Sequence, residues 1–310
     1  MRISVIIPVF NEEKSIANLH AEIVPCIEAL TKDYEIIYIN DGSTDSSIKE
    51  IEKLNSITLI NLQRRYGQAT ALDAGFKHAT GDIVVTLDAD GQNDPRDIAN
   101  LIELLHAKQY DVVAGWRVHR RDPFLVRVFT RVGRFLRIIF IADPIHDAGC
   151  SLRVYNKASI KSLDIGGEMH RYILTLLRWK GYRIGEKEVH HRERLHGSSK
   201  YGITKTIRGL IDLLYIWFIY KYSERPLHLF GYISFGAFAG GVITGMWSVY
   251  GKIMWNLSLN RNGWFFITGF LFLASVICFS FGIVIDLLMR IHTHVSPFEK
   301  RYYIKNIVRT

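Results

Sequence analysis

The chain has 310 residues, of which 48% are hydrophobic, with a net charge of +9 and a mean hydropathy of +0.08. This length has room for one sizeable α/β domain and a smaller addition, and the hydropathy argues against both a wholly soluble enzyme and a many-pass transporter. The positive charge suits a nucleic acid, an anionic lipid or a phosphorylated substrate, and composition alone does not choose among these partners.

Runs rich in Val and Ile alternate with helical patterns along the first part of the chain. The expected strands are residues 3–9, 34–39, 57–62, 83–87 and 112–115, and the expected helices are residues 12–30, 45–54, 68–79 and 96–107. This alternation predicts a mostly parallel sheet covered on both faces. Ligands bind such sheets beyond the carboxyl ends of the strands.

Two long uncharged runs follow near the end of the chain. Residues 229–251 and 263–285 contain no Asp, Glu, Lys, Arg or His, and each exceeds the roughly 20 residues that span a membrane. They predict two transmembrane helices, the alternative being a pair of buried core helices. Basic residues are frequent before the first run and after the second, whereas the connection holds only Lys252 and Arg261. This bias predicts a multi-pass protein of the cell (inner) membrane, with the catalytic part and both termini cytoplasmic.

Two further segments have the pattern of helices that lie in the lipid headgroup plane. Residues 124–140 place four arginines three or four positions apart among apolar residues: Arg127, Arg131, Arg134 and Arg137. Residues 201–220 combine Lys205 and Arg208 with an apolar, aromatic remainder. We predict amphipathic interface helices. The alternative is an ordinary helix packed on the sheet with a solvated basic stripe.

The strongest local signal is LDADGQ at residues 87–92, directly after an expected strand. Two carboxylates two residues apart, Asp88 and Asp90, can be directed at one site, and Gln92 adds a neutral oxygen ligand. Such oxygen ligands suit Mg²⁺ or Mn²⁺, which would neutralise the diphosphate of a nucleotide sugar. Acidic pairs are common in loops, but the position at the end of an interior strand favours a metal site.

Two more polar clusters follow expected strands. PVFNE at residues 8–12 turns the chain from strand to helix, and NDGSTD at residues 40–45 brings Asp41 to a strand end, where it can accept hydrogen bonds from a base or ribose. Ser43 or Thr44 can also serve simply as a helix cap. Neither segment has the glycine pattern of a phosphate-binding loop.

Together these three segments resemble the family 2 glycosyltransferases, which have a nucleotide-sugar-binding (GT-A-like) α/β sheet. The similarity continues through GQATALDAGF at residues 67–76 and ATGD at residues 79–82. GWR at residues 115–117, HDAGCSLR at residues 146–153 and RLHGSSKYG at residues 194–202 resemble the polyprenyl-phosphate branch. That branch includes dolichyl-phosphate mannose synthases and undecaprenyl-phosphate glucosyltransferases, and its bacterial members with a membrane hairpin match the two apolar runs.

The resemblance implies a role for each matching residue. Asp88, Asp90 and Gln92 would form the metal and diphosphate site, and the nucleoside would be contacted by Pro8, Phe10, Glu12 and Asp41. Arg117 and Arg131 would face the lipid phosphate, Asp147 would lie near the reacting sugar, and Lys200 would close over the diphosphate with Ser199 and Arg194. The chain departs from the family at Asn40, where Asp is frequent, and at Arg65, where Asn is usual.

The resemblance also implies an organisation and a reaction. Residues 1–200 would be the cytoplasmic glycosyltransferase domain, residues 201–227 an interfacial region, residues 228–289 the two transmembrane helices and residues 290–310 a basic cytoplasmic tail. The reaction would be inverting transfer of a hexose from a nucleotide sugar, UDP-glucose before GDP-mannose, to undecaprenyl or dolichyl phosphate. The expected partners are donor, polyprenyl phosphate and membrane lipids. The resemblance is also compatible with a homo-oligomer. No nucleic acid is expected as a partner, because the basic residues cluster beside the apolar runs.

Two other functions compete with this interpretation. A nucleotidyltransferase would also place acidic metal ligands on a parallel sheet, but it needs no membrane spans, and its Gly-rich basic N-terminal loop is absent from the sequence. A membrane-tethered scaffold or lipid-binding partner of a flippase would keep a degenerate transferase domain. The presence of Asp88, Asp90, Gln92 and Lys200 favours an enzyme.

Overall fold

The computed structural model describes residues 1–118, 133, 135–141, 143–167, 169–192, 211, 213–218, 221–222, 225–256, 258, 262–295 and 302–309. The chain divides into two compact units. The first consists of Met1–Ile207 with Lys300–Thr310, and the second of Arg208–Glu299.

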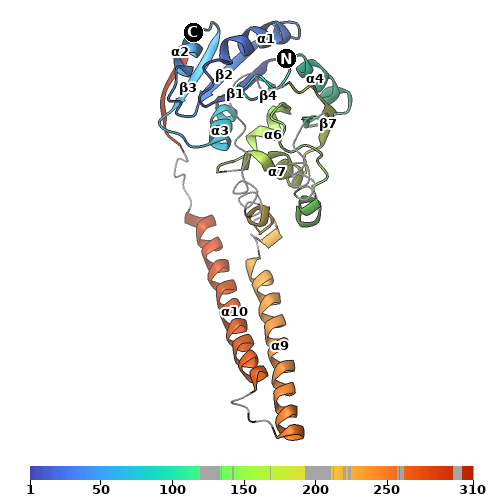
Figure 1. Ribbon diagram of the computed structural model, residues 1–310. Coiled ribbons are helices and arrows are strands. Elements are labelled where there is room, and N and C mark those ends of the chain that lie inside the picture. Colours follow the sequence, from blue (N-terminus) through green and yellow to red (C-terminus); the bar gives the residue numbers. More distant parts are fainter. Residues whose placement is uncertain are drawn as a thin grey trace. The chain divides into compact units, whose positions relative to one another are not determined.

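The first unit is built on an eight-stranded sheet with the order β7-β5-β6-β4-β1-β2-β3-β8 (Figure 1). The strands are β1 (Ile3–Val9), β2 (Tyr34–Asn40), β3 (Ile57–Leu62), β4 (Ile83–Thr86), β5 (Val112–Trp116), β6 (Arg153–Asn156), β7 (Ile184–Glu188) and β8 (Ile304–Arg309). Strand β1 pairs in parallel with β2 and β4, and β2 pairs in parallel with β3. Strand β6 is antiparallel to both β4 and β5. The predicted mostly parallel sheet is therefore confirmed, with antiparallel insertions.

Helices cover both faces of the sheet. They are α1 (Ile16–Glu28), α2 (Ser47–Glu52), α3 (Gln68–His78), α4 (Asp97–Ala107), α6 (Lys157–Lys161), η1 (Met169–Tyr172) and α7 (Ile173–Trp179). Residues of α1, α2 and α4 join one hydrophobic core, and residues of α3, α6 and α7 join the other. Successive residues of β1 alternate between them, since Val5 and Ile7 belong to the first core and Ile6 to the second. Burial on both faces explains why the strands are continuous apolar runs.

Strand β8 was not foreseen, because the sequence predicted only a basic tail for residues 290–310. In the structure β8 pairs antiparallel with β3, with Leu59 opposite Val308, and the Gln63 N–H donates to the Tyr303 carbonyl at 2.8 Å. Without β8, β3 would present a row of unpaired backbone groups. Pairing with an existing strand gives these six residues their structure.

Part of the segment predicted to form a basic interfacial helix is described. Residues 135–141 are helical, and Arg137 does not form part of the solvated basic stripe that belonged to the alternative interpretation. Its guanidinium donates to the fully buried Asp143 carboxylate at 3.2 Å and to the Ile145 carbonyl at 3.2 Å. A buried carboxylate requires such a cationic partner. The outward-facing residues are instead apolar: Phe135, Ile138 and Ile139. Arg127, Arg131 and Arg134 lie outside the described residues.

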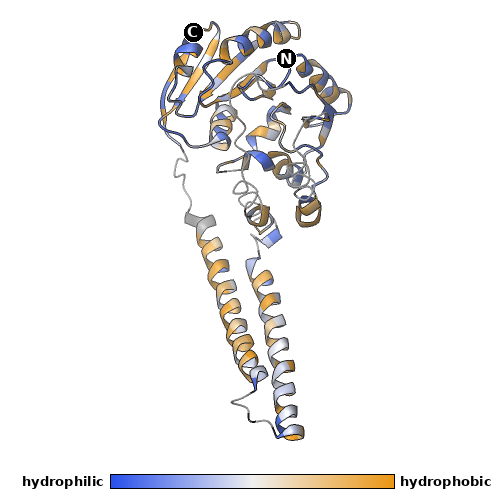
Figure 2. Cartoon of the chain, in the orientation of Figure 1, coloured by the Kyte–Doolittle hydropathy of each residue, from blue (hydrophilic) through white to orange (hydrophobic). Residues whose placement is uncertain are grey.

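The second unit contains a hairpin of two long helices, α9 (Pro226–Trp255) and α10 (Gly263–Val295). Both are apolar along most of their length (Figure 2). Pro226–Trp255 and Gly263–Met289 are long and apolar enough to cross a membrane. Hydroxyl groups link the two helices, because Ser234 Oγ donates to the Ser275 carbonyl at 2.9 Å and Thr268 Oγ1 to Thr244 Oγ1 at 2.9 Å. The helices thus form a candidate membrane hairpin with polar contacts between them.

Candidate active site

The polar segments that follow β1, β2 and β4 come together at one edge of the sheet. They line a cavity of about 230 Å³. Six of the residues predicted for the site are in its wall: Pro8, Phe10, Glu12, Asp41, Asp88 and Asp90. The other lining residues are Val9, Arg65, Gln68, Ala71 and Ala89. The parallel pairing of β1 with β2 and β4 explains this convergence, because the carboxyl ends of parallel strands meet at one edge.

Asp88 and Asp90 are two of the four carboxylates in the cavity wall. The side-chain amide of Gln68 donates to Asp88 Oδ1 at 2.6 Å, and the backbone N–H of Gln92 donates to Asp90 Oδ1 at 3.1 Å. Burial and the neighbouring Asp90 charge raise the pKa of Asp88 to about 6, against the opposing effects of Ser151, Arg117 and Arg153. Two carboxylates that repel each other in this way are a suitable environment for a divalent cation.

A cation bound there would need further ligands. The described residues contain no group of three or more His, Cys, Asp or Glu side chains arranged to hold a metal. Mg²⁺ in proteins is commonly held by one or two carboxylates together with substrate phosphates and water. The donor set formed by Asp88 and Asp90 therefore fits a cation that binds together with a diphosphate.

Asp41 fastens the loop after β3 to the end of β2. Its carboxylate accepts the Tyr66 N–H at 2.6 Å and the Gly67 N–H at 2.9 Å. Burial raises the pKa of Asp41, and these two N–H groups and the Arg65 charge act in the opposite direction. Gly42 has a φ of +70°, and a Cβ there would lie 2.6 Å from the backbone nitrogen of Arg65. The loop can pack this closely only on a glycine.

Side chains in the loops after β1 and β2 also bind each other. Asn11 adopts a φ of 58°, a region that asparagine tolerates better than most residues. Its Oδ1 accepts the Thr44 N–H at 2.8 Å, and its own N–H donates to Ser43 Oγ at 3.1 Å. Asn40, where the family often has Asp, donates to Asn61 Oδ1 at 3.1 Å and accepts the Ser43 N–H at 2.9 Å. Asn40 thus links the end of β2 to β3 and to the loop after β2.

Arg117 and Asp147 form a nearly buried ion pair, and the Arg117 charge acts on Asp88. Arg117 donates from Nε to Asp147 Oδ2 at 2.7 Å and from Nη2 to Asp147 Oδ1 at 2.9 Å. The two side chains are only 14% and 7% exposed. The sequence predicted separate roles for them, facing the lipid phosphate and the reacting sugar. The structure brings them into direct contact, so that Asp147 fixes the orientation of the guanidinium.

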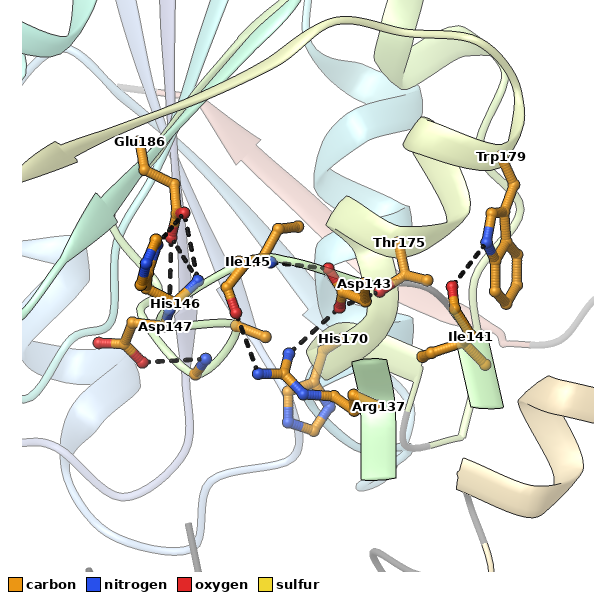
Figure 3. A network of polar contacts seen from close by, with 12 residues as sticks. Arg137, Ile141, Asp143, Ile145, His146, Asp147, His170, Thr175, Trp179 and Glu186 are labelled. Atoms are coloured by element: carbon orange, nitrogen blue, oxygen red, sulfur yellow. Dashed lines mark hydrogen bonds and ion pairs between the residues drawn. The ribbon is translucent and has the colours of Figure 1, made fainter. Parts of the chain in front are cut away.

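The turn that carries Asp147 is supported from β7. The Glu186 carboxylate accepts the backbone N–H groups of His146 and Asp147 at 2.9 and 3.3 Å (Figure 3). The His146 ring stacks on Trp116 with centroids 4.4 Å apart. The buried Arg153 of β6 donates to the carbonyls of Ala148 and Cys150. The position of Asp147 therefore depends on β5, β6 and β7 together.

The structure brings together some predicted residues and adds others. Gln92 lies beside the cavity as the donor to Asp90. Arg131, Arg194, Ser199 and Lys200 fall outside the described residues. Arg65 and Gln68 are in the wall of the cavity but were not predicted as site residues. The available signal was their position next to Gly67, where Arg65 lies in the loop after an expected strand and Gln68 begins the expected helix.

Comparison with known proteins agrees with this architecture. The pattern of glycosyl transferase family 2 matches residues 4–164. The chain is 32% identical over 298 residues to a dodecaprenyl-phosphate galacturonate synthase of Rhizobium johnstonii, covering 94% of this chain and 88% of the relative. It is 31% identical over 312 residues to an undecaprenyl-phosphate 4-deoxy-4-formamido-L-arabinose transferase of Shewanella sediminis, covering 99% and 92%.

Solved structures share the fold. A complex of glucosyl-3-phosphoglycerate synthase from Mycobacterium tuberculosis with Mn²⁺, UDP and phosphoglyceric acid superposes with a TM-score of 0.57 at 20% identity. The superposition covers 70% of this chain and 78% of that one. The sheet, the strand-end motifs and the full-length similarity agree with one another. The chain belongs to glycosyl transferase family 2.

Proposed function

We propose that the protein transfers a sugar from a nucleotide sugar to polyprenyl phosphate. The observation that supports this most directly is the cavity at the ends of β1, β2 and β4, with the Asp88 and Asp90 carboxylates in its wall. The curated relatives, which match nearly the whole chain, are named for polyprenyl-phosphate products or acceptors. The sequence similarity includes the apolar hairpin, which supports a lipid substrate.

The residues of the cavity divide between the two halves of the donor. We assign Pro8, Phe10, Glu12 and Asp41 to the nucleoside and Asp88, Asp90 and Gln92 to the diphosphate and its cation. Mg²⁺ or Mn²⁺, when bound there, neutralises the departing nucleoside diphosphate. Complexes of the structurally similar synthase contain one or the other ion. Lys200, Ser199 and Arg194 are proposed to contact the same diphosphate.

The acceptor phosphate is already anionic, so the reaction needs cations and positioning more than a strong base. We assign this role to Arg117, held by Asp147, and to Arg131. An acceptor oxygen attacks the anomeric carbon as the bond to the diphosphate breaks and the nucleoside diphosphate leaves. In-line displacement inverts the configuration, giving a β-linked product from an α-linked donor. A product with the same anomeric configuration as its donor, observed by NMR, would falsify this step.

A transfer assay tests the function and identifies the sugar. The sequence favoured UDP-glucose and then GDP-mannose, whereas the relatives are named for galacturonate and 4-deoxy-4-formamido-L-arabinose. Purified protein would therefore be mixed with undecaprenyl phosphate, Mn²⁺ and one of four donors. These are UDP-glucose, GDP-mannose, UDP-galacturonate and UDP-4-deoxy-4-formamido-L-arabinose. Label that enters the organic phase with one donor supports the proposal. No transfer from any donor, combined with no nucleotide binding, contradicts it.

We further propose that α9 and α10 cross the cell membrane, with the catalytic unit and both termini cytoplasmic. Strand β8 supports this topology, because Lys300–Thr310, which follow the hairpin in sequence, belong to the same compact unit as Met1–Ile207, which precede it. The chain therefore returns to the side from which it left.

Cysteine labelling of intact cells is expected to show this topology. A membrane-impermeant maleimide should label Ser258→Cys, in the connection between the helices, from outside. Lys305→Cys, in β8, should react only after permeabilisation. The wild-type chain, with Cys26, Cys150 and Cys278, gives the background. Labelling of both variants from outside, or of neither, would contradict the proposed topology.

A further inference from the structure

Arg65 is the only cation among the described residues that line the cavity, whose wall also contains four carboxylates. Its side chain is exposed, and its guanidinium carbon lies 4.0 Å from the centroid of the Phe10 ring. Within the described part of the chain, the guanidinium N–H groups have no hydrogen-bond partner. Arg65 therefore presents a planar face and free donors to whatever enters the cavity.

The backbone on either side of Arg65 is fixed. Asp41 holds the N–H groups of Tyr66 and Gly67, and Gly42 lets the Arg65 nitrogen pack directly against the loop after β2. The side chain therefore extends over Phe10 from a rigid anchor. A group held in this way loses little conformational freedom when a ligand binds.

Arg65 contacts residues that follow β1 and β2. Its guanidinium lies on the Phe10 ring, after β1, and its charge acts on Asp41, after β2. Both Phe10 and Asp41 belong to the group of residues assigned above to the nucleoside.

The guanidinium of Arg65 stacked on the Phe10 ring suits a flat, uncharged ligand. Arg65 already covers the Phe10 ring, so an entering ring meets the outer face of the guanidinium. Guanidinium groups stack well on π-systems and donate hydrogen bonds to carbonyl oxygens in their plane. We propose that Arg65, stacked on Phe10, is the platform on which the nucleobase of the donor stacks. It is then a specificity-determining residue for the nucleoside half of the substrate. This inference rests on the proposed function.

Calorimetry on the full-length protein in detergent tests the proposal. The ligands are uridine, UDP, guanosine and GDP, each with Mn²⁺, and the variants are Arg65→Ala and Arg65→Lys. We expect Arg65→Ala to raise the dissociation constants of a nucleoside and of its diphosphate by the same factor, about fivefold to tenfold. Arg65→Lys should lose nearly as much, because an ammonium group has no planar face.

Arg64→Ala is the matched control. Arg64 is the exposed neighbour, its guanidinium carbon lies 4.7 Å from the Tyr66 ring, and it is not in the cavity wall. Its removal changes the net charge equally and should leave all dissociation constants unchanged.

The alternative results are distinguishable. If Arg65→Ala weakens the diphosphates alone and Arg65→Lys restores them, Arg65 contacts phosphate and the platform is wrong. If Arg65→Ala binds every ligand as Arg64→Ala does, Arg65 has no part in binding. If the wild-type protein binds none of the four ligands, the proposed function itself fails.

Discussion

Replacing Asp90 with alanine is expected to lower sugar transfer by about a hundredfold to a thousandfold, the usual cost of removing one electrostatic contact to a leaving group. Asp90 is half-buried, and its described bond is to the Gln92 N–H, so the fold should survive. The measurement is the rate of label transfer to undecaprenyl phosphate, with and without a chelator. Activity of the wild-type protein should disappear with the chelator and return with Mg²⁺ or Mn²⁺.

Two further variants make this result specific to the site. Asp90→Asn keeps the shape but removes the charge, and it should lose most of the activity. Glu50→Ala removes an acid from the surface of α2 and should retain wild-type rates. Transfer by Asp90→Ala within a factor of three of wild type would exclude Asp90 as a ligand of the diphosphate and its cation.

Removing Asp147 should damage both stability and transfer. Asp147→Ala leaves the Arg117 guanidinium nearly buried and unpaired, which typically costs about 3–5 kcal/mol. In a unit of this size, 3 kcal/mol corresponds to a fall in Tm of roughly 6–12 °C. Differential scanning fluorimetry measures the change, and the transfer assay below the transition measures the loss of Arg117 positioning.

A second ion pair and a double variant test whether the loss of stability comes from leaving a buried charge unpaired. Arg96 is paired with the buried Asp94 but is itself 76% exposed, and Asp94 keeps a second ion pair with Arg192 at 3.0 Å, so Arg96→Ala leaves no unpaired buried charge and should cost less than Asp147→Ala. Replacing Arg117 and Asp147 together with Met and Leu should recover much of the stability, since no charge remains buried, but none of the activity. Equal Tm losses for Asp147→Ala and Arg96→Ala would show that burial does not govern the pair.

The sequence predicted the strands that are buried on both faces. The bounds of β1 and β3 agree with the expected residues 3–9 and 57–62, because doubly buried strands are uninterrupted apolar runs. Strands β6, β7 and β8 were not predicted. They are short or polar, as in IKNIVR of β8, and pair with strands far away in sequence. Such pairing leaves no local pattern to detect.

The same distinction applies to the site. Asp88, Asp90 and Asp41 stand directly after strands, and topology alone brings them to one edge. Arg65 and Gln68 reach the cavity through contacts that no spacing encodes, namely the stacking of Arg65 on Phe10 and the hydrogen bond from the Gln68 side-chain amide to Asp88. The pairing of Arg117 with Asp147 likewise joins two motifs that were interpreted separately.

The position of β8 has a consequence for biosynthesis. Its partner β3 is made early, but β8 leaves the ribosome only after both apolar helices have been synthesised. Until then the β3 edge is open, and open edges are the sites at which nascent chains aggregate or attract chaperones. With the topology proposed above, a nascent chain whose hairpin inserted only one helix would carry β8 to the wrong side of the bilayer, leaving that edge exposed. Completion of the sheet would then act as a check on correct insertion.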